Sequence, residues 1–173
     1  TLFVGGGTPS LFGSGGMEGL ARLLGRDRLS GPDLEWTAEA NPESFSRAVA
    51  GALGNDGGRL IHIASVSSYV ANAEYAAYAS SKAALSQIVK VLGREWAPRN
   101  ILVNAIGPAL TETRLTCDYL SDEDFRHKAV SVIPMGRLGE AEDLFGAVVL
   151  LLSPAGKFIT GQTIYVDGGR TLV

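Results

Sequence analysis

The chain has 173 residues, 46% hydrophobic and 19% charged, which suits one compact domain with a real core. Its formal net charge of -3 gives no basic field for nucleic-acid phosphates or a membrane surface, so a small-molecule partner is favoured. No stretch approaches the ~20 uninterrupted apolar residues of a membrane helix, and we expect a cytoplasmic protein. Cys117 is the only cysteine, which excludes a cysteine-held iron–sulfur cluster, and no metal site is predicted.

Short apolar runs alternate with longer helical patterns along the chain, which predicts a mainly parallel sheet wrapped by helices. We therefore expect a three-layer α/β sandwich of about five strands, in a single domain covering residues 1–173. The predicted strands are 1–4, 34–40, 60–64, 101–106 and 163–166. The predicted helices are 19–24, 44–53, 75–97, a short helix capped by Ser121 with acidic residues 122–124 in its first turn, and 140–152.

Some segments carry stronger patterns than others. The run 60–64 is almost wholly apolar, as expected for a strand covered by helices on both faces. Pro98 is expected to end the long helix, and Gly107 with Pro108 to break the following strand abruptly. An i, i+3, i+4, i+7 stripe runs along the long helix, formed by Leu85, Ile88, Val89, Leu92 and Trp96.

A candidate catalytic set follows from these elements. Ser65 comes directly after the strand 60–64, at the carboxyl edge of the sheet, where open parallel sheets bind ligands. Tyr78 and Lys82 are four apart on one helical face. A free tyrosine has a pKa near ~10, but a cation held close favours the phenolate, and Ser65 would then hydrogen-bond a substrate oxygen. Taken alone, the Tyr78–Lys82 spacing also fits an ordinary surface pair.

Four motifs follow one another in this chain. They are Ile61-His62-Ile63-Ala64-Ser65, Tyr78-Ala79-Ser80-Ser81-Lys82-Ala83-Ala84-Leu85, Asn104-Ala105-Ile106-Gly107-Pro108 and Gly161-Gln162-Thr163-Ile164-Tyr165-Val166-Asp167-Gly168-Gly169. In this order they resemble the short-chain dehydrogenase/reductase family, from about Phe45 to Val173. The resemblance implies a Rossmann-like fold and a hydride transfer between NAD or NADP and a secondary alcohol or carbonyl.

The resemblance also implies a role for each residue. Tyr78 is the general acid/base, Lys82 lowers the tyrosine's pKa and hydrogen-bonds the nicotinamide ribose, and Ser65 orients and polarises the substrate oxygen. A homodimer or homotetramer is implied as well. The substrate stays open, because the loop 109–126 carries no decisive chemistry. The implied cofactor-binding residues are Tyr78, Lys82, Pro108, Thr111 and Thr113.

The start of the chain departs from the family. Its Gly-x-x-x-Gly-x-Gly turn has no match among the glycines between Gly5 and Gly15, and Pro9 removes a backbone donor there. The family's ribose-reading residue and its Asn-Asn-Ala-Gly stretch are also missing, so NAD and NADP are not distinguished. The turn after Gly5 fits phosphate binding or a plain loop. The family also has an asparagine before its serine-bearing strand that helps a water relay to the lysine. Asn41 lies near that place, and it also fits a plain residue at the start of a helix.

Residues 1–44 resemble a different family. Phe3-Val4-Gly5-Gly6-Gly7-Thr8-Pro9-Ser10-Leu11 and Glu39-Ala40-Asn41-Pro42-Glu43-Ser44 look like segments of radical S-adenosylmethionine enzymes related to oxygen-independent coproporphyrinogen oxidase. Their three-cysteine cluster motif is missing, so only the shape would be borrowed. The chain is then a possible chimera. The absence of methionine at position 1 fits a start inside a longer or engineered sequence, or removal of that methionine.

Two functions stay open at this point. The first is an NAD(P)-dependent oxidoreductase that uses Ser65, Tyr78 and Lys82. The second is a catalytically silent chimeric, designed or truncated scaffold that lacks the nucleotide-binding half. Among the remaining residues, His62 is expected to pack inside its strand, and Cys117 to be an unreactive thiol.

Overall fold

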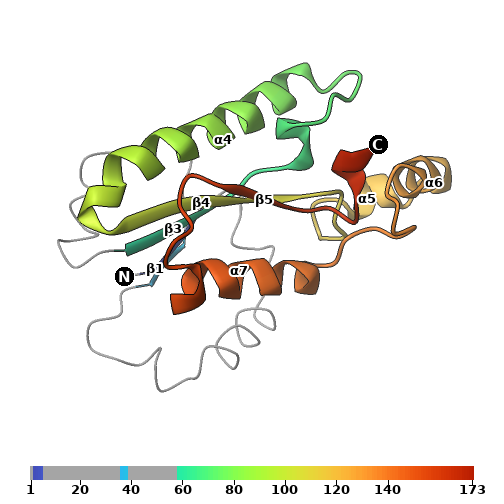
Figure 1. Cartoon of the computed structure of the whole chain (residues 1–173). Helices are drawn as coiled ribbons and strands as arrows, with labels where there is room; N and C mark the ends of the chain where they lie inside the picture. The colour runs from blue at the N-terminus through green and yellow to red at the C-terminus, as the bar shows by residue number, and fades with distance from the viewer. Residues whose placement is uncertain (1, 6–35, 39–57) are drawn as a thin grey trace.

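A parallel sheet forms the centre of the molecule. The computed structural model describes residues 2–5, 36–38 and 58–173, whose strands form one five-stranded sheet in the order β2-β1-β3-β4-β5 (Figure 1). The predicted Rossmann-like α/β fold is confirmed, while the helices predicted at 19–24 and 44–53 lie outside the described residues. The strands are β1 (Leu2–Gly5), β2 (Trp36–Ala38), β3 (Gly58–Ile63), β4 (Ile101–Pro108) and β5 (Thr163–Val166).

The strand order reverses at β1. This strand pairs in parallel with β2 on one side and with β3 on the other. From the boundary between β1 and β3, the strands follow chain order in one direction as β1, β2 and in the other as β3, β4, β5. In the register between β1 and β3, Gly5 lies opposite His62. The carboxyl ends of β1 and β3 are therefore neighbours at a topological switch point, the place where doubly wound sheets bind their ligands. Within the strand predicted at 34–40, the described residues Trp36–Ala38 form the edge strand of this sheet.

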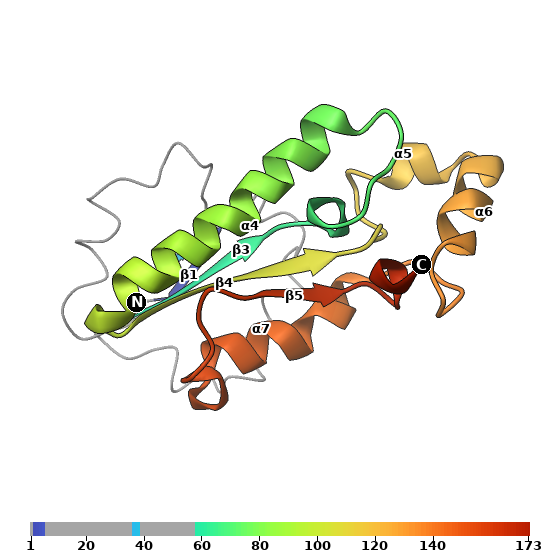
Figure 2. The same cartoon turned by 45° about the horizontal axis from the view of Figure 1, so that its top comes forward.

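Helices cover both faces of the sheet. The helix α4 (Ala76–Trp96) lies over one face and α7 (Phe145–Leu152) over the other (Figures 1 and 2). Alternate residues of β3 and β4 point to opposite faces, so each face has its own apolar cluster. The cluster under α4 contains Leu60, Ala64, Leu85, Val89, Ile101, Val103 and Ala105. The cluster over α7 contains Ile61, Ile63, Ile106, Leu144, Val148 and Leu151.

Short helical turns link these elements. The α-helical ones are α5 (Cys117–Leu120) and α6 (Glu123–Ser131), and the 3₁₀ turns are η3 (Val66–Ser68), η4 (Ala97–Arg99), η5 (Ala141–Leu144), η6 (Pro154–Gly156) and η7 (Arg170–Leu172). Within the described ranges, no helix combines the length and apolar content that crossing a bilayer requires.

Two helix starts differ from the sequence prediction. Ser121 does not cap the acidic helix; Asp122 does, accepting bonds from the backbone N–H of Asp124 and Phe125 at 2.9 and 3.1 Å. A carboxylate also suits the positive end of a helix better than a hydroxyl. The helix expected over 140–152 opens as the 3₁₀ turn η5, because a capping box between Glu140 and Asp143 tightens its first turn.

The strand β4 is longer than predicted. Gly107 and Pro108 do not break it but pair with Tyr165 and Val166 of β5. Glycine is required there because a Cβ at position 107 would lie 2.5 Å from the Tyr165 ring. Proline is tolerated because β3 ends opposite Ile106, so no strand residue on that side needs an N–H from Pro108. The motif Gly-Pro therefore continues the sheet up to the loop that follows.

The buried Asn104 fixes β4 to the segment before β5. Its side chain is 2% exposed, donates to the Ile159 carbonyl at 2.8 Å and accepts from the Gln162 N–H at 3.0 Å. These two bonds satisfy backbone groups that no strand pairing serves. Asn104 thus sets where β5 begins along β4.

Candidate active site

Ser65 lies just beyond the carboxyl end of β3 and is 8% exposed. It caps η3, with its Oγ accepting a hydrogen bond from the N–H of Ser67 at 3.1 Å. Its carbonyl accepts a bond from Ser68 Oγ at 2.7 Å. Because Ser65 Oγ is the acceptor in its cap, its own proton stays available to another oxygen. The local turn therefore holds a hydroxyl donor at the sheet edge.

Lys82 joins α4 to the same strand end. Its Nζ donates to the carbonyl of Ile63, two residues before Ser65, at 3.0 Å. Burial lowers the pKa of Lys82 from its ordinary value. An ammonium has three N–H donors, so this bond leaves two for a ligand. The lysine is thus fixed at the carboxyl edge with donors to spare.

Tyr78 lies one helical turn before Lys82. The lysine Nζ is 5.7 Å from the centre of the tyrosine ring, which is 45% exposed. Tyr75 packs edge-on against this ring at 6.1 Å between centroids. In the described part of the chain no hydrogen bond joins Tyr78 to Ser65, although Lys82 connects the helix of one to the strand of the other. The phenol therefore faces solvent beside a cation, as an accessible proton donor would.

The loop after β4 is closed by threonine hydroxyls. Thr111 is 8% exposed, and its Oγ1 donates to the carbonyl of Ala109 at 3.0 Å. Thr116 Oγ1 donates to the carbonyl of Thr111 at 2.8 Å and accepts from the N–H of Thr113 at 2.9 Å. Pro108 and Thr113 stay half-buried. Of the three predicted cofactor contacts in this loop, Thr111 is thus turned into the loop itself.

The chain is similar in sequence to a family of known oxidoreductases. The family model described as Enoyl-(Acyl carrier protein) reductase matches residues 38–171. A tropinone reductase homolog from Arabidopsis thaliana is 37% identical over 174 residues, which cover 94% of this chain and 64% of that relative. The chain belongs to the short-chain dehydrogenase/reductase family. The family match begins earlier than residue 45, where the sequence motifs suggested it would.

Solved structures agree with this family assignment. A 4-hydroxyisoleucine dehydrogenase complexed with NADH has a TM-score of 0.72 and 34% identity, over 76% of this chain and 55% of that chain. A putative 2-deoxy-d-gluconate 3-dehydrogenase from Agrobacterium tumefaciens with bound NADP has a TM-score of 0.70 and 33% identity, over 73% of this chain and 52% of that one. The chain therefore spans little more than half the length of these family members.

The residues at the carboxyl edge fit the nicotinamide cofactor of these family structures. Lys82 offers two N–H donors, which suits the paired hydroxyls of a ribose, and Tyr78 lies next to it. Gly5 ends β1 beside β3 at the switch point, where a dinucleotide would cross the sheet. The glycine-rich run that follows Gly5 lies outside the described residues. Roles for Tyr78, Lys82, Pro108, Thr111 and Thr113 in cofactor binding stay predictions.

His62 lies under this site, fully buried in β3 as the sequence predicted. Burial lowers its pKa to about 4, and the positive charge of Lys82 adds to the effect. The ring is therefore neutral at pH 7. It shares the α4 face of the sheet with Leu60 and Ala64, so protonation would place a second cation beneath Lys82.

This geometry predicts acid sensitivity. The folded-state pKa of His62 lies below the unfolded value of 6.5, so the unfolded chain takes up the proton first as the pH falls. As the pH falls from 6.5 to 4, we expect His62 to lower the free energy of unfolding by about 3 kcal/mol. Denaturant unfolding of wild type and His62→Gln at pH 7 and pH 4 measures the difference. His127→Gln, on the exposed surface of α6, is the matched control, and equal acid loss in all three proteins contradicts the prediction.

Some contacts near Ser65 were missed by sequence reasoning. Tyr165, which was read only as part of the last strand, has its hydroxyl 2.9 Å from Ser68 Oγ and its ring 5.8 Å from that of Tyr69. Arg170 donates to the side-chain oxygen of Asn72 at 3.0 Å, across 98 positions of sequence. The chain gives no local signal for such pairs, because only the fold brings its C-terminal turn to the loop after Ser65.

Proposed function

We propose that this protein is an NAD(P)-dependent oxidoreductase that interconverts a secondary alcohol and its carbonyl compound. The observation that carries the proposal is Lys82, whose Nζ is bonded to the end of β3 next to Ser65 and lies 5.7 Å from the Tyr78 ring. The ammonium of Lys82 therefore lies between the strand end that carries Ser65 and the ring of Tyr78, at the carboxyl edge of the sheet. Family membership and relatives with bound NADP or NADH support the same chemistry.

The residues divide the work by their chemistry. In the direction of reduction, Tyr78 donates the phenolic proton to the substrate oxygen, and in oxidation it takes that proton back. Ser65 donates a hydrogen bond to the same oxygen as negative charge develops there. Lys82 favours the phenolate by its positive charge and would hold the nicotinamide ribose. When bound, the nicotinamide ring supplies or accepts the hydride at the substrate carbon.

The alternative of a catalytically silent scaffold is not favoured. The relatives and solved structures that the chain matches are dehydrogenases and reductases. The borrowing of residues 1–44 from radical S-adenosylmethionine enzymes is a proposal that rests on sequence likeness alone. The homodimer or homotetramer, the single domain, the lack of an iron–sulfur cluster and the cytoplasmic location likewise stay predictions.

Cofactor binding is the direct test of the proposed function. We expect NADH or NADPH to bind with a dissociation constant below about 1 mM, the upper range of enzyme affinities. Titration of the chain with each cofactor, followed by nicotinamide fluorescence, measures this and also reveals which cofactor is preferred. A panel of ketones then reports cofactor oxidation by absorbance. Failure of both cofactors to bind at that concentration would overturn the proposal for this chain.

A further inference from the structure

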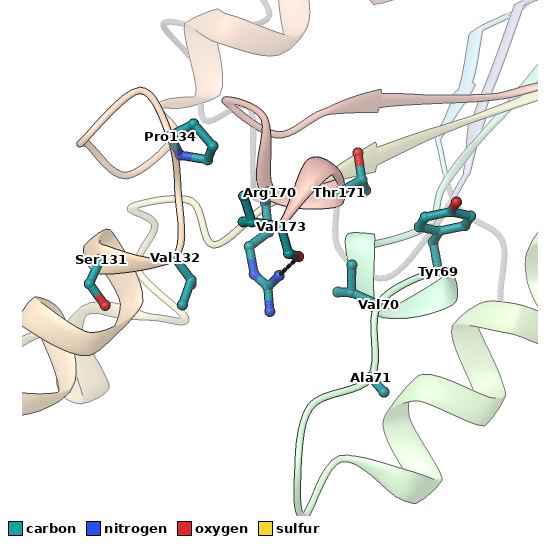
Figure 3. A pocket seen from close by; sticks show the side chains of 9 residues that line it. All are labelled: Tyr69, Val70, Ala71, Ser131, Val132, Pro134, Arg170, Thr171 and Val173. Atoms are coloured by element: carbon teal, nitrogen blue, oxygen red, sulfur yellow. Dashed lines mark hydrogen bonds between the residues drawn. The ribbon is translucent and has the colours of Figure 1, made fainter.

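A cavity opens beside the loop that follows η3 (Figure 3). Its volume is about 730 Å³, which is room for a small organic molecule. It lies between the loop after η3, the end of α6 and the C-terminal turn η7. The lining residues are Tyr69, Val70, Ala71, Ser131, Val132, Pro134, Arg170, Thr171 and Val173.

One wall of the cavity is part of the chain segment that joins two proposed catalytic residues. Residues 69–71 lie between Ser65 and Tyr78. At the Ser65 end, Ser68 Oγ bonds the Ser65 carbonyl and contacts the Tyr165 hydroxyl. At the other end, Tyr75, which precedes the first residue of α4, donates its N–H to the Asn72 carbonyl at 3.3 Å. A molecule in this cavity therefore lies next to the loop that positions both groups.

Arg170 brings a positive charge into the cavity. Among the nine described residues that line the space, it is the only one with a charged side chain. Its Nη1 donates to the Val173 main-chain oxygen at 3.1 Å and its Nη2 to Asn72 Oδ1 at 3.0 Å. Neither partner is an Asp or Glu side chain. These two bonds fix the guanidinium in place and leave further N–H donors for a ligand.

The nearest acidic residue along the chain is already engaged. Asp167 accepts the N–H of Gly169 at 3.0 Å on one oxygen and the N–H of Thr171 at 2.7 Å on the other. Those bonds shape the turn that leads into Arg170. The carboxylate therefore serves the backbone of the turn, and the arginine is presented to the cavity as an anchored cation.

The rest of the lining indicates what kind of anion fits. Valine, alanine and proline side chains make most of the wall, which suits a short carbon skeleton. A single arginine matches one carboxylate, which a guanidinium binds through two parallel bonds. A phosphate group carries about −1.5 to −2 charges and would call for further cations. The cavity thus has one charged point on an apolar wall.

We propose that Arg170 recognises a carboxylate on the substrate, so that the enzyme acts on small oxo or hydroxy acids. This inference rests on the proposed oxidoreductase function for its reaction, while the binding site stands on the cavity alone. Arg170 selects among substrates and takes no part in proton transfer. The apolar wall contacts the carbon skeleton, and the reacting carbonyl lies toward the Ser65 end of the loop.

Binding of matched acids and esters tests the inference. The probes are pyruvate, acetoacetate and levulinate, whose carbonyl lies at increasing distance from the carboxylate, each with its methyl ester. We expect at least one acid to bind the full chain about tenfold more tightly than its ester in calorimetric titration at pH 7, because a charge-assisted bond is lost in the ester. The preference should vanish in Arg170→Met and be partly kept in Arg170→Lys.

A matched control removes the same charge elsewhere. Arg94 is exposed in the last turn of α4. Its neighbour Gly93 approaches Gly161, which precedes β5, so Arg94 lies near the amino ends of the strands, away from the cavity. Arg94→Met should keep the acid preference. The inference is overturned if acids and esters bind equally, if no acid binds, or if the acid preference survives unchanged in both Arg170 variants. Oxidation of NADH and of NADPH with the same probes tests the reaction separately. Equal turnover of acid and ester contradicts only the Arg170 site, and acid binding without turnover contradicts only the reaction.

Discussion

Tyr78→Phe is expected to lower turnover by about 10²–10⁴-fold, the usual contribution of a positioned general acid/base. The change removes one hydroxyl from a ring that is 45% exposed, so packing and stability should hold. Cofactor affinity should also be nearly unchanged, because Lys82 keeps its bond to Ile63. Steady-state rates with a ketone that the wild type reduces, together with a cofactor titration of the same variant, measure both effects.

Tyr75→Phe is the matched control for this experiment. Tyr75 packs edge-on against Tyr78 on the same helix start and is similarly exposed, but no lysine follows four positions later. It should keep activity within a few fold of wild type. If Tyr78→Phe retains wild-type activity, the phenol is not the proton donor. If both variants lose activity alike, the aromatic pair acts through structure.

Lys82→Met should have the second largest effect, a loss of about 10²-fold in kcat/KM. Two consequences of the same change add up. Without the cation the phenolate beside it is less favoured, so the activity profile should move toward higher pH. Without the N–H donors the cofactor loses a contact, so its apparent KM should rise. Measuring kcat and KM for the cofactor across pH separates the two.

Lys90→Met supplies the control for charge and helix content. Lys90 is exposed on α4 two turns after Lys82, so its loss should change neither parameter. Lys82→Arg keeps the positive charge and should retain part of the pH profile while losing the geometry of the bond to Ile63. An unshifted pH profile in Lys82→Met contradicts an electrostatic role for this lysine.

Sequence patterns predicted the elements with strong periodicity. The last strand was predicted at Thr163–Val166, its observed bounds, and the long helix was predicted within one residue at each end. Its apolar stripe packs as expected, with Leu85 and Val89 buried and Trp96 partly buried. These predictions succeed because an element with one buried face carries apolar residues at the regular spacing of that face. Where no repeat exists, as in α5 (Cys117–Leu120), no sequence pattern predicted a helix.

Contacts with neighbours in space decided the remaining elements. The extension of β4 through Gly107 depends on the Tyr165 ring, which fills the space a side chain would need. The helix cap at Asp122 instead of Ser121 depends on where α5 stops, since Ser121 donates its N–H to the Cys117 carbonyl at 3.0 Å. Tyr165 lies 58 positions from Gly107 along the chain, and the end of α5 follows no sequence repeat, so local patterns predicted neither feature.

The sequence by itself determined the family motifs and the parallel α/β fold, and it proposed the set Ser65, Tyr78 and Lys82, because these depend on residue type and short spacing. Only the tertiary structure decided that Lys82 is fixed to the strand end of Ser65, that Thr111 turns into its own loop, and that Arg170 reaches the loop after Ser65. The contacts of Lys82 and Arg170 join residues that are far apart along the chain, and they form only when the sheet aligns the carboxyl ends of its strands at one edge.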